Sequence, residues 1–184
     1  RKADIDTANL DARLLLCKYL NKDKLYLIVN ANEEIEVDSA FNELVERREK
    51  YEPMQYILGK AEFYGLDFKV NKNVLIPRPD TEILVERVID YVGDNNYTIV
   101  DIGTGSGCIP ITVAVNCKNA DVYTVDISPD ATKVAVDNAK DNGVVDRVSF
   151  LNMDILKHFP DFKVDCIVSN PPYIPLTEDV DPLV

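Results

Sequence analysis

The sequence has few of the residues that build metal centres and nucleophilic triads. Its 184 residues include one histidine, His158, and four cysteines, none of which form a Cys-x-x-Cys pair. Zinc sites need clustered histidine and cysteine ligands, and a catalytic triad needs a well-placed histidine. We therefore expect no metal site, no disulfide framework and no nucleophile of the Ser/His/Asp or Cys/His type.

Long apolar runs and excess positive charge are also missing. The apolar stretch 109–115 is far shorter than the ~20 residues of a membrane helix, and the opening Arg-Lys-Ala-Asp is unlike a signal peptide and is interpreted as a trimmed terminus. Twenty Lys and Arg against 32 Asp and Glu give a net charge of −12, which repels nucleic-acid phosphates. We expect a cytoplasmic protein with no membrane contact and no direct nucleic-acid partner.

Residues 1–60 have the apolar spacing of short helices. The pattern predicts one helix over 10–20, a second over 25–29 capped by Asp23, and a third around 41–45 that ends near Pro53. Together they would form a small bundle, either a structural cap on a larger domain or a module that binds a partner.

Residues 61–78 show a different period and are interpreted as a β-hairpin linker. Apolar residues lie on both sides of Asn71-Lys72-Asn73, which predicts the turn of the hairpin. The segment Pro77-Arg78-Pro79-Asp80-Thr81-Glu82 then predicts the start of a helix capped by Asp80.

Residues 79–184 alternate between strand and helix patterns. Strands are predicted over 98–102, 121–127, 148–151 and 164–169, and helices over 109–115 and 129–142. This alternation is typical of right-handed crossovers and a parallel, doubly wound α/β sheet.

A glycine-rich loop follows the first of these strands. It consists of Gly103, Thr104, Gly105, Ser106 and Gly107. Glycine lets a ligand approach the backbone closely at the point where a helix begins. The spacing Gly-x-Gly-x-Gly departs from the Gly-x-Gly-x-x-Gly of dinucleotide sites, which disfavours NAD and FAD.

Two carboxylates accompany this loop. Asp126 ends the second strand, where nucleotide-binding α/β folds bind a ribose, and Asp101 adds a second carboxylate beside the loop. Negative charge disfavours a polyphosphate and favours a cationic ligand such as S-adenosylmethionine. The alternative is that Asp126 only caps the helix after Ser128.

The fourth strand ends in Asn170-Pro171-Pro172-Tyr173. The Asn170 amide oxygen and the Pro171 carbonyl can accept hydrogen bonds, and Tyr173 offers a flat face, so the motif suits a planar NH₂ group. The alternative is a rigid turn.

These motifs together resemble one enzyme family. The resemblance is carried by 55–59 (Gln-Tyr-Ile-Leu-Gly), 62–65 (Glu-Phe-Tyr-Gly), 77–82, 101–107 and 170–173. The sequence is similar to HemK-type peptide chain release factor N5-glutamine methyltransferases over essentially its whole length. Asn-Pro-Pro-Tyr alone also occurs in adenine methyltransferases, so an N6-adenine DNA or RNA methyltransferase stays an alternative, as does a non-catalytic nucleotide-binding module.

The resemblance implies the cofactor, the substrate and the roles of several residues. The cofactor would be S-adenosylmethionine, and the substrate the glutamine of the Gly-Gly-Gln motif of bacterial class 1 release factors, docked by residues 1–60. The loop 103–107 would hold the methionine part, Asp126 the ribose, and Asp154 with Ile155 would lie near the adenine. The substrate would be bound by Asn170, Pro171, Pro172 and Tyr173. Of these, Asn170, Pro171 and Tyr173 would be catalytic, and Asn170 would also border the cofactor.

The resemblance also implies a Rossmann-like methyltransferase sheet of seven strands. Only four are visible in 79–184. A sheet that ended there would leave an unprotected edge, so we expect the polypeptide to continue and the methyltransferase domain to be incomplete at its C-terminal side.

Overall fold

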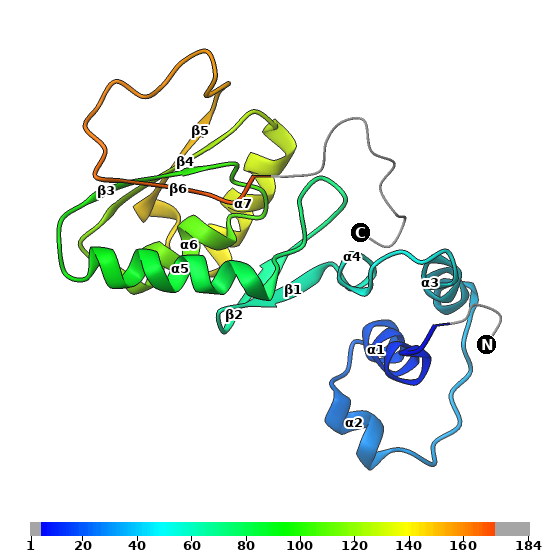
Figure 1. The fold of residues 1–184 in the computed structure, drawn as a ribbon. Coiled ribbons are helices and arrows are strands. Elements are labelled where there is room, and N and C mark those ends of the chain that lie inside the picture. Colours follow the sequence, from blue (N-terminus) through cyan, green and yellow to red (C-terminus); the bar gives the residue numbers. More distant parts are fainter. Residues whose placement is uncertain (1–4, 172–184) are drawn as a thin grey trace. The chain divides into compact units, whose positions relative to one another are not determined.

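The computed structural model describes residues 5–171 in two compact units, one ending at Gly59 and the other beginning at Lys60. The described part of the first unit is helical (Figure 1), with α1 (Ala8–Leu20), α2 (Lys24–Val29), α3 (Ser39–Glu49) and α4 (Met54–Leu58). The three predicted helices are confirmed, and the Asp23 side chain caps α2 by accepting a hydrogen bond from the Tyr26 N–H. The five-residue α4 was not predicted because it is too short to show a helical period.

The second unit begins with a hairpin whose turn differs from the predicted one. Strands β1 (Lys60–Phe63) and β2 (Leu66–Lys69) pair antiparallel around Tyr64 and Gly65. Both turn residues have positive φ, 50° and 72°, as the tight turn that matches the twist of two strands requires. The hairpin turn is therefore not at Asn71-Lys72-Asn73, as the sequence predicted. A turn does form there, in which the Val74 N–H donates to the Asn71 carbonyl at 3.1 Å, but it follows the hairpin.

Helix α5 (Pro79–Val92) also begins differently from the prediction. Its N-cap is Arg78, which makes no side-chain capping bond, and Pro79 occupies the first turn with Asp80. The predicted Asp80 cap is therefore wrong. Proline starts the helix here because its fixed φ suits the first helical position, and the Asp80 carboxylate lies at the positive end of the helix dipole.

The predicted alternation of strands and helices is confirmed. Four parallel strands, β3 (Thr98–Ile102), β4 (Asp121–Asp126), β5 (Val148–Asn152) and β6 (Cys166–Ser169), lie in the order β5-β4-β3-β6. Helix α6 (Cys108–Asn116) connects β3 to β4, and α7 (Pro129–Asp141) with the short 3₁₀ helix Val145–Arg147 connects β4 to β5. The chain is therefore a Rossmann-like α/β fold with a helical N-terminal part.

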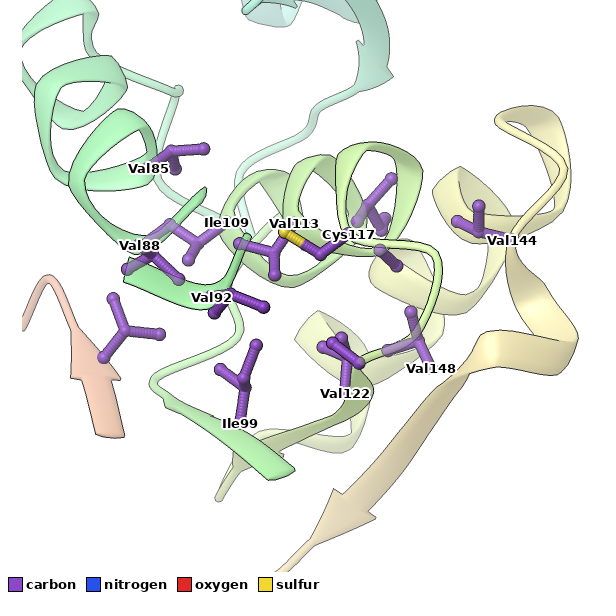
Figure 2. Packing of buried hydrophobic residues seen from close by; sticks show 14 of the residues in the cluster. Val85, Val88, Val92, Ile99, Ile109, Val113, Cys117, Val122, Val144 and Val148 are labelled. Atoms are coloured by element: carbon purple, nitrogen blue, oxygen red, sulfur yellow. The ribbon is translucent and has the colours of Figure 1, made fainter. Parts of the chain in front are cut away.

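One hydrophobic core joins the helices to the sheet. Ile99, Val122 and Val148 point from the strands toward Val113 of α6 and toward Cys117, which directly follows α6 (Figure 2), and all five are at least 95% buried. Phe63 and Phe68 of the hairpin belong to the same core, which fixes the hairpin against this unit. Every described helix is too short or too polar to cross a lipid bilayer.

Candidate active site

The strand order creates a crevice at the carboxyl end of the sheet. From β3 the chain turns to β4 on one side, whereas β6 lies on the other side of β3. Ligands bind at such a switch point because the two connections leave in opposite directions. A cavity of about 450 Å³ lies here, lined by Leu75, Ile102, Gly103, Gly105, Val125, Asp126, Ile127, Met153, Asp154, Ile155, Leu156 and Asn170.

The glycine loop contributes only part of its length to this cavity. Gly103 and Gly105 line it, whereas Thr104, Ser106 and Gly107 are buried beneath. A Cβ at Gly107 would lie 2.8 Å from Ile111 Cδ1 and 3.0 Å from Ala135 Cβ. Gly107 is therefore needed for the close packing of α6 and α7.

The Asp126 carboxylate lies at the cavity wall and organises two backbone segments. Its Oδ2 accepts a hydrogen bond from the Gly105 N–H at 3.0 Å, and its Oδ1 accepts one from the Ser128 N–H at 2.8 Å. The cap of α7 is Ser128, whose Oγ accepts from the Ala131 N–H. Asp126 is thus not the helix cap itself, and it faces the cavity as well as the loop.

The second predicted carboxylate, Asp101, lies outside the cavity. Asp101 is fully buried beneath the loop and does not line the cavity. Its Oδ2 accepts a hydrogen bond from Thr124 Oγ1 at 2.8 Å, and Thr124 Oγ1 lies 2.6 Å from Thr104 Oγ1. Because Thr124 donates its only hydroxyl proton to Asp101, Thr104 is the donor in the hydrogen bond between the two threonines. Asp101 supports the loop from below.

Burial controls the charge of Asp101. Burial is the largest cause that raises the pKa of this carboxyl, the Thr124 hydrogen bond lowers it, and the nearby Asp126 charge raises it, with the net result that the pKa moves from 3.8 to about 7. Asp101 Oδ1 has no hydrogen-bond partner in the described part of the chain, which also disfavours the charged form.

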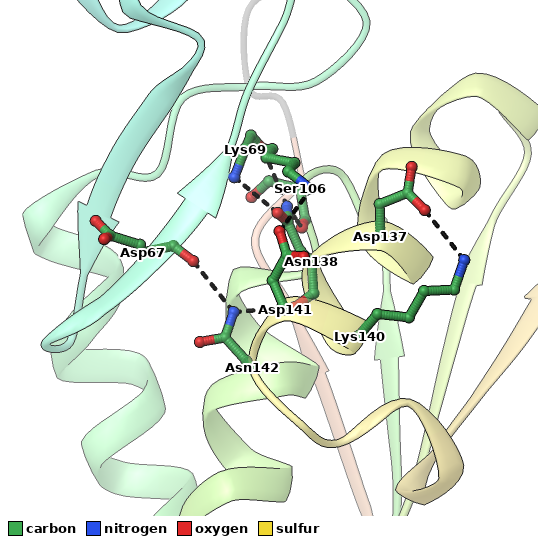
Figure 3. A network of polar contacts seen from close by, with 8 residues as sticks. All are labelled: Asp67, Lys69, Ser106, Asp137, Asn138, Lys140, Asp141 and Asn142. Atoms are coloured by element: carbon green, nitrogen blue, oxygen red, sulfur yellow. Dashed lines mark hydrogen bonds and ion pairs between the residues drawn. The ribbon is translucent and has the colours of Figure 1, made fainter. Parts of the chain in front are cut away.

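A buried amide ties the loop to the hairpin (Figure 3). Asn138 of α7 donates from Nδ2 to the Ser106 carbonyl at 2.8 Å and to the Lys69 carbonyl at 3.0 Å, and its Oδ1 accepts from the Lys69 N–H at 2.7 Å. Both N–H donors and the oxygen of this buried side chain thus bond to two backbone segments, which the side chain holds together. Sequence reasoning missed Asn138 because its partners lie 69 and 32 residues away.

The ends of β5 and β6 complete the cavity. Asp154 and Ile155, for which the resemblance implies a place near the adenine, follow β5 and line the cavity, and Asn170 lines it from the end of β6. Pro171 is exposed, and Pro172 and Tyr173 lie outside the described residues. Apolar neighbours such as Ile127 and Met153 were missed, although Ile127 is an exposed apolar residue directly after a strand, which is a usable signal. Residues 5–171 hold no group of three or more His, Cys, Asp or Glu side chains that could bind a metal ion.

Solved structures share this architecture. A transferase structure from Pyrococcus horikoshii matches with a TM-score of 0.50 and 25% identity, covering 59% of this chain and 40% of that one. A SAM-dependent methyltransferase from Agrobacterium tumefaciens matches with a TM-score of 0.50 and 19% identity, covering 61% and 39%, and shows the fold alone. Fold and cavity together define a Rossmann-like α/β protein with a ligand site at the switch point of its sheet.

Family models and curated relatives narrow the class. The methyltransferase small domain model matches residues 79–180, and the PrmC N-terminal domain model matches residues 1–59. The chain belongs to the methyltransferase small domain family. The release factor glutamine methyltransferase of Clostridium acetobutylicum is 46% identical, and the match covers 89% of this chain and 59% of that protein. The release factor glutamine methyltransferase of Bacillus anthracis is 44% identical, and the match covers 88% of this chain and 59% of that protein. A bifunctional methyltransferase of Rickettsia prowazekii is 40% identical, and the match covers 96% of this chain and 38% of that protein. The chain thus spans about three fifths or less of these relatives.

Proposed function

We propose that the protein methylates the side-chain amide nitrogen of the glutamine in the Gly-Gly-Gln motif of bacterial class 1 release factors, with S-adenosylmethionine as cofactor. The observation that carries the proposal is the meeting of Asp126 and Asn170 at one cavity. The names of the relatives, release factor glutamine methyltransferase, support the choice of substrate. Release factors act in translation, which places the proposed reaction in the cytoplasm.

The residues of the cavity fit this cofactor. Its volume of about 450 Å³ suits a nucleoside-sized ligand. The Asp126 carboxylate would bind the ribose hydroxyls, and Ile127, Met153 and Ile155 provide an apolar wall for the adenine. Gly103 and Gly105 expose backbone without side chains to the methionine part. When bound, S-adenosylmethionine supplies an electrophilic methyl group on a positively charged sulfur.

The task of the protein residues is to orient a weak nucleophile. The lone pair of an amide nitrogen is delocalised into its carbonyl group, so precise placement matters more than deprotonation. Asn170 Oδ1 and the Pro171 carbonyl would each accept one N–H of the substrate amide, which fixes its plane and stabilises developing positive charge. Tyr173 would pack against the flat amide group.

The helical first unit would dock the release factor. Leu25, Ile28 and Val29 of α2 are 63, 71 and 73% exposed, and Leu10 of α1 is 52% exposed. Exposed apolar side chains gathered in one small unit are typical of a surface that binds another protein. This favours the partner-binding interpretation of residues 1–60 over a purely structural cap.

Labelled cofactor tests the proposal. The purified protein is incubated with methyl-labelled S-adenosylmethionine and either a class 1 release factor, the same factor with its motif changed to Gly-Gly-Ala, or duplex DNA. We expect label in the unchanged factor only. Label in DNA alone would show an adenine methyltransferase, and cofactor binding without transfer to any acceptor would support the non-catalytic module.

A further inference from the structure

The segment Pro77–Glu82 is singled out by the sequence, yet none of its residues lines the cavity. Thr81 lies in the first turn of α5 and is only 6% exposed. Its backbone N–H donates to the Arg78 carbonyl at 3.0 Å, and its side-chain hydroxyl makes a separate contact.

That hydroxyl contacts the proposed substrate-binding amide. Asn170 Nδ2 donates a hydrogen bond to Thr81 Oγ1 at 2.9 Å, across 89 residues of sequence. A side-chain amide has a donor end and an acceptor end of nearly equal shape, so it can be turned around with little steric change. Because the NH₂ end of Asn170 is bonded to Thr81, the Oδ1 end is the one that is not bonded to Thr81.

We propose that Thr81 is a positioning residue that holds the Asn170 amide with its oxygen available to the substrate. This inference rests on the proposed function, because the substrate amide offers N–H donors. If Asn170 were turned around, its NH₂ group would face those donors, and no hydrogen bond could form. As acceptor of the Nδ2–H, Thr81 thus holds the productive orientation without touching the substrate.

The first turn of α5 is itself fixed in place. Glu82, the next residue, accepts a hydrogen bond from the Tyr64 N–H in the hairpin turn at 2.8 Å. Val85, one turn further, is fully buried in the core. Thr81 is therefore held between two anchored neighbours, as a residue that orients another must be.

Three variants test the proposal. Thr81→Val keeps the shape but removes the hydroxyl, Thr81→Ser keeps the hydroxyl, and Thr112→Val is the control. Thr112 is a fully buried helical threonine whose Oγ1 has no hydrogen-bond partner in the described residues. We expect Thr81→Val to lower kcat roughly 5- to 10-fold, the loss of about one hydrogen bond. Thr81→Ser and Thr112→Val should keep kcat, and the KM for S-adenosylmethionine should stay within about twofold in all three.

Two further measurements separate positioning from general damage. In an Asn170→Ala background, Thr81→Val should lower kcat no further, because there is no amide left to orient. The NMR signals of the Asn170 side-chain NH₂ should show slowed hydrogen exchange in the wild type and in Thr81→Ser, and fast exchange in Thr81→Val. If Thr81→Val unfolds the protein, Thr81→Ala removes the same hydroxyl without a branched side chain.

The outcomes distinguish this inference from the proposed function. Equal kcat in wild type and Thr81→Val, equal loss in Thr81→Ser, or an undiminished effect in the Asn170→Ala background would overturn the positioning role. Unprotected Asn170 NH₂ signals in the wild type would do the same. A wild-type protein that methylates no release factor would overturn the proposed function, whereas the NMR comparison would still report on the contact.

Discussion

Thr124 of β4 donates a hydrogen bond to the buried carboxyl group of Asp101 on the adjacent strand β3, at 2.8 Å. Through Thr104, which lies 2.6 Å from Thr124, this pair supports the glycine loop. The charge of a residue outside the cavity is thereby linked to the backbone that lines it.

The first prediction concerns pH. Burial raises the pKa of Asp101 from 3.8 to about 7, so between these values the folded protein binds a proton that the unfolded chain does not. The stability from Asp101 is fully present below about pH 4 and is lost as pH rises through 7, with a slope of at most ~1.4 kcal/mol per pH unit. Asp101→Asn should remove this dependence. Denaturant unfolding of both proteins at pH 5, 6, 7 and 8 measures the difference, and parallel stability curves would contradict it.

The second prediction concerns Asn138. Asn138→Leu leaves the Lys69 N–H, the Lys69 carbonyl and the Ser106 carbonyl without their partner. We expect the free energy of unfolding to fall by about 2 to 4 kcal/mol, because buried polar groups are costly when unpaired. Asn142→Ala is the control. It removes an exposed bond to the Asp67 carbonyl and a second bond to the Asn138 carbonyl, which keeps the Asn142 N–H as its partner, so the change should cost less than about 1 kcal/mol. Equal losses in both variants would show that the Asn138 network contributes little.

The third prediction concerns Asp126. If it binds the ribose, Asp126→Ala should weaken the binding of S-adenosylhomocysteine roughly 10- to 100-fold, the value of a charge-assisted hydrogen bond, as measured by calorimetry. Ser128→Ala removes the α7 cap but keeps the carboxylate, so it should lower stability by about 1 kcal/mol and leave affinity unchanged. Unchanged affinity in a folded Asp126→Ala protein would limit Asp126 to its backbone contacts.

The fourth prediction concerns Asn170. Asn170→Ala should lower kcat by at least ~100-fold, since it removes a preorganised acceptor for the substrate amide. Cofactor affinity and melting temperature should change little, because the side chain is only half buried. Steady-state kinetics with a release factor substrate decides the matter, and near-normal turnover would favour the rigid-turn alternative for Asn-Pro-Pro-Tyr.

The sequence by itself determined the strands and helices of the α/β unit, and it indicated that the site lies at the carboxyl ends of the strands. Short strand patterns separated by helical patterns predicted β3, β4, β5 and β6, because buried parallel strands and amphipathic helices have different periods. Glycine spacing and Asp126 predicted where a ligand would lie, since the carboxyl ends of parallel strands meet at one edge. These are local signals, readable from neighbouring residues.

Tertiary structure decided what depends on distant neighbours. The hairpin turn fell at Tyr64-Gly65 because backbone conformation and core packing of Phe63 and Phe68 outweighed the polar run 71–73. Asp101 became a buried support for the loop, although the sequence suggested a carboxylate that faces the ligand, because its strand is covered on the side where its carboxyl group lies. The contact of Thr81 with Asn170 joins residues 89 positions apart, and no periodicity records such a pair, because only the folded sheet brings the end of β6 to the start of α5.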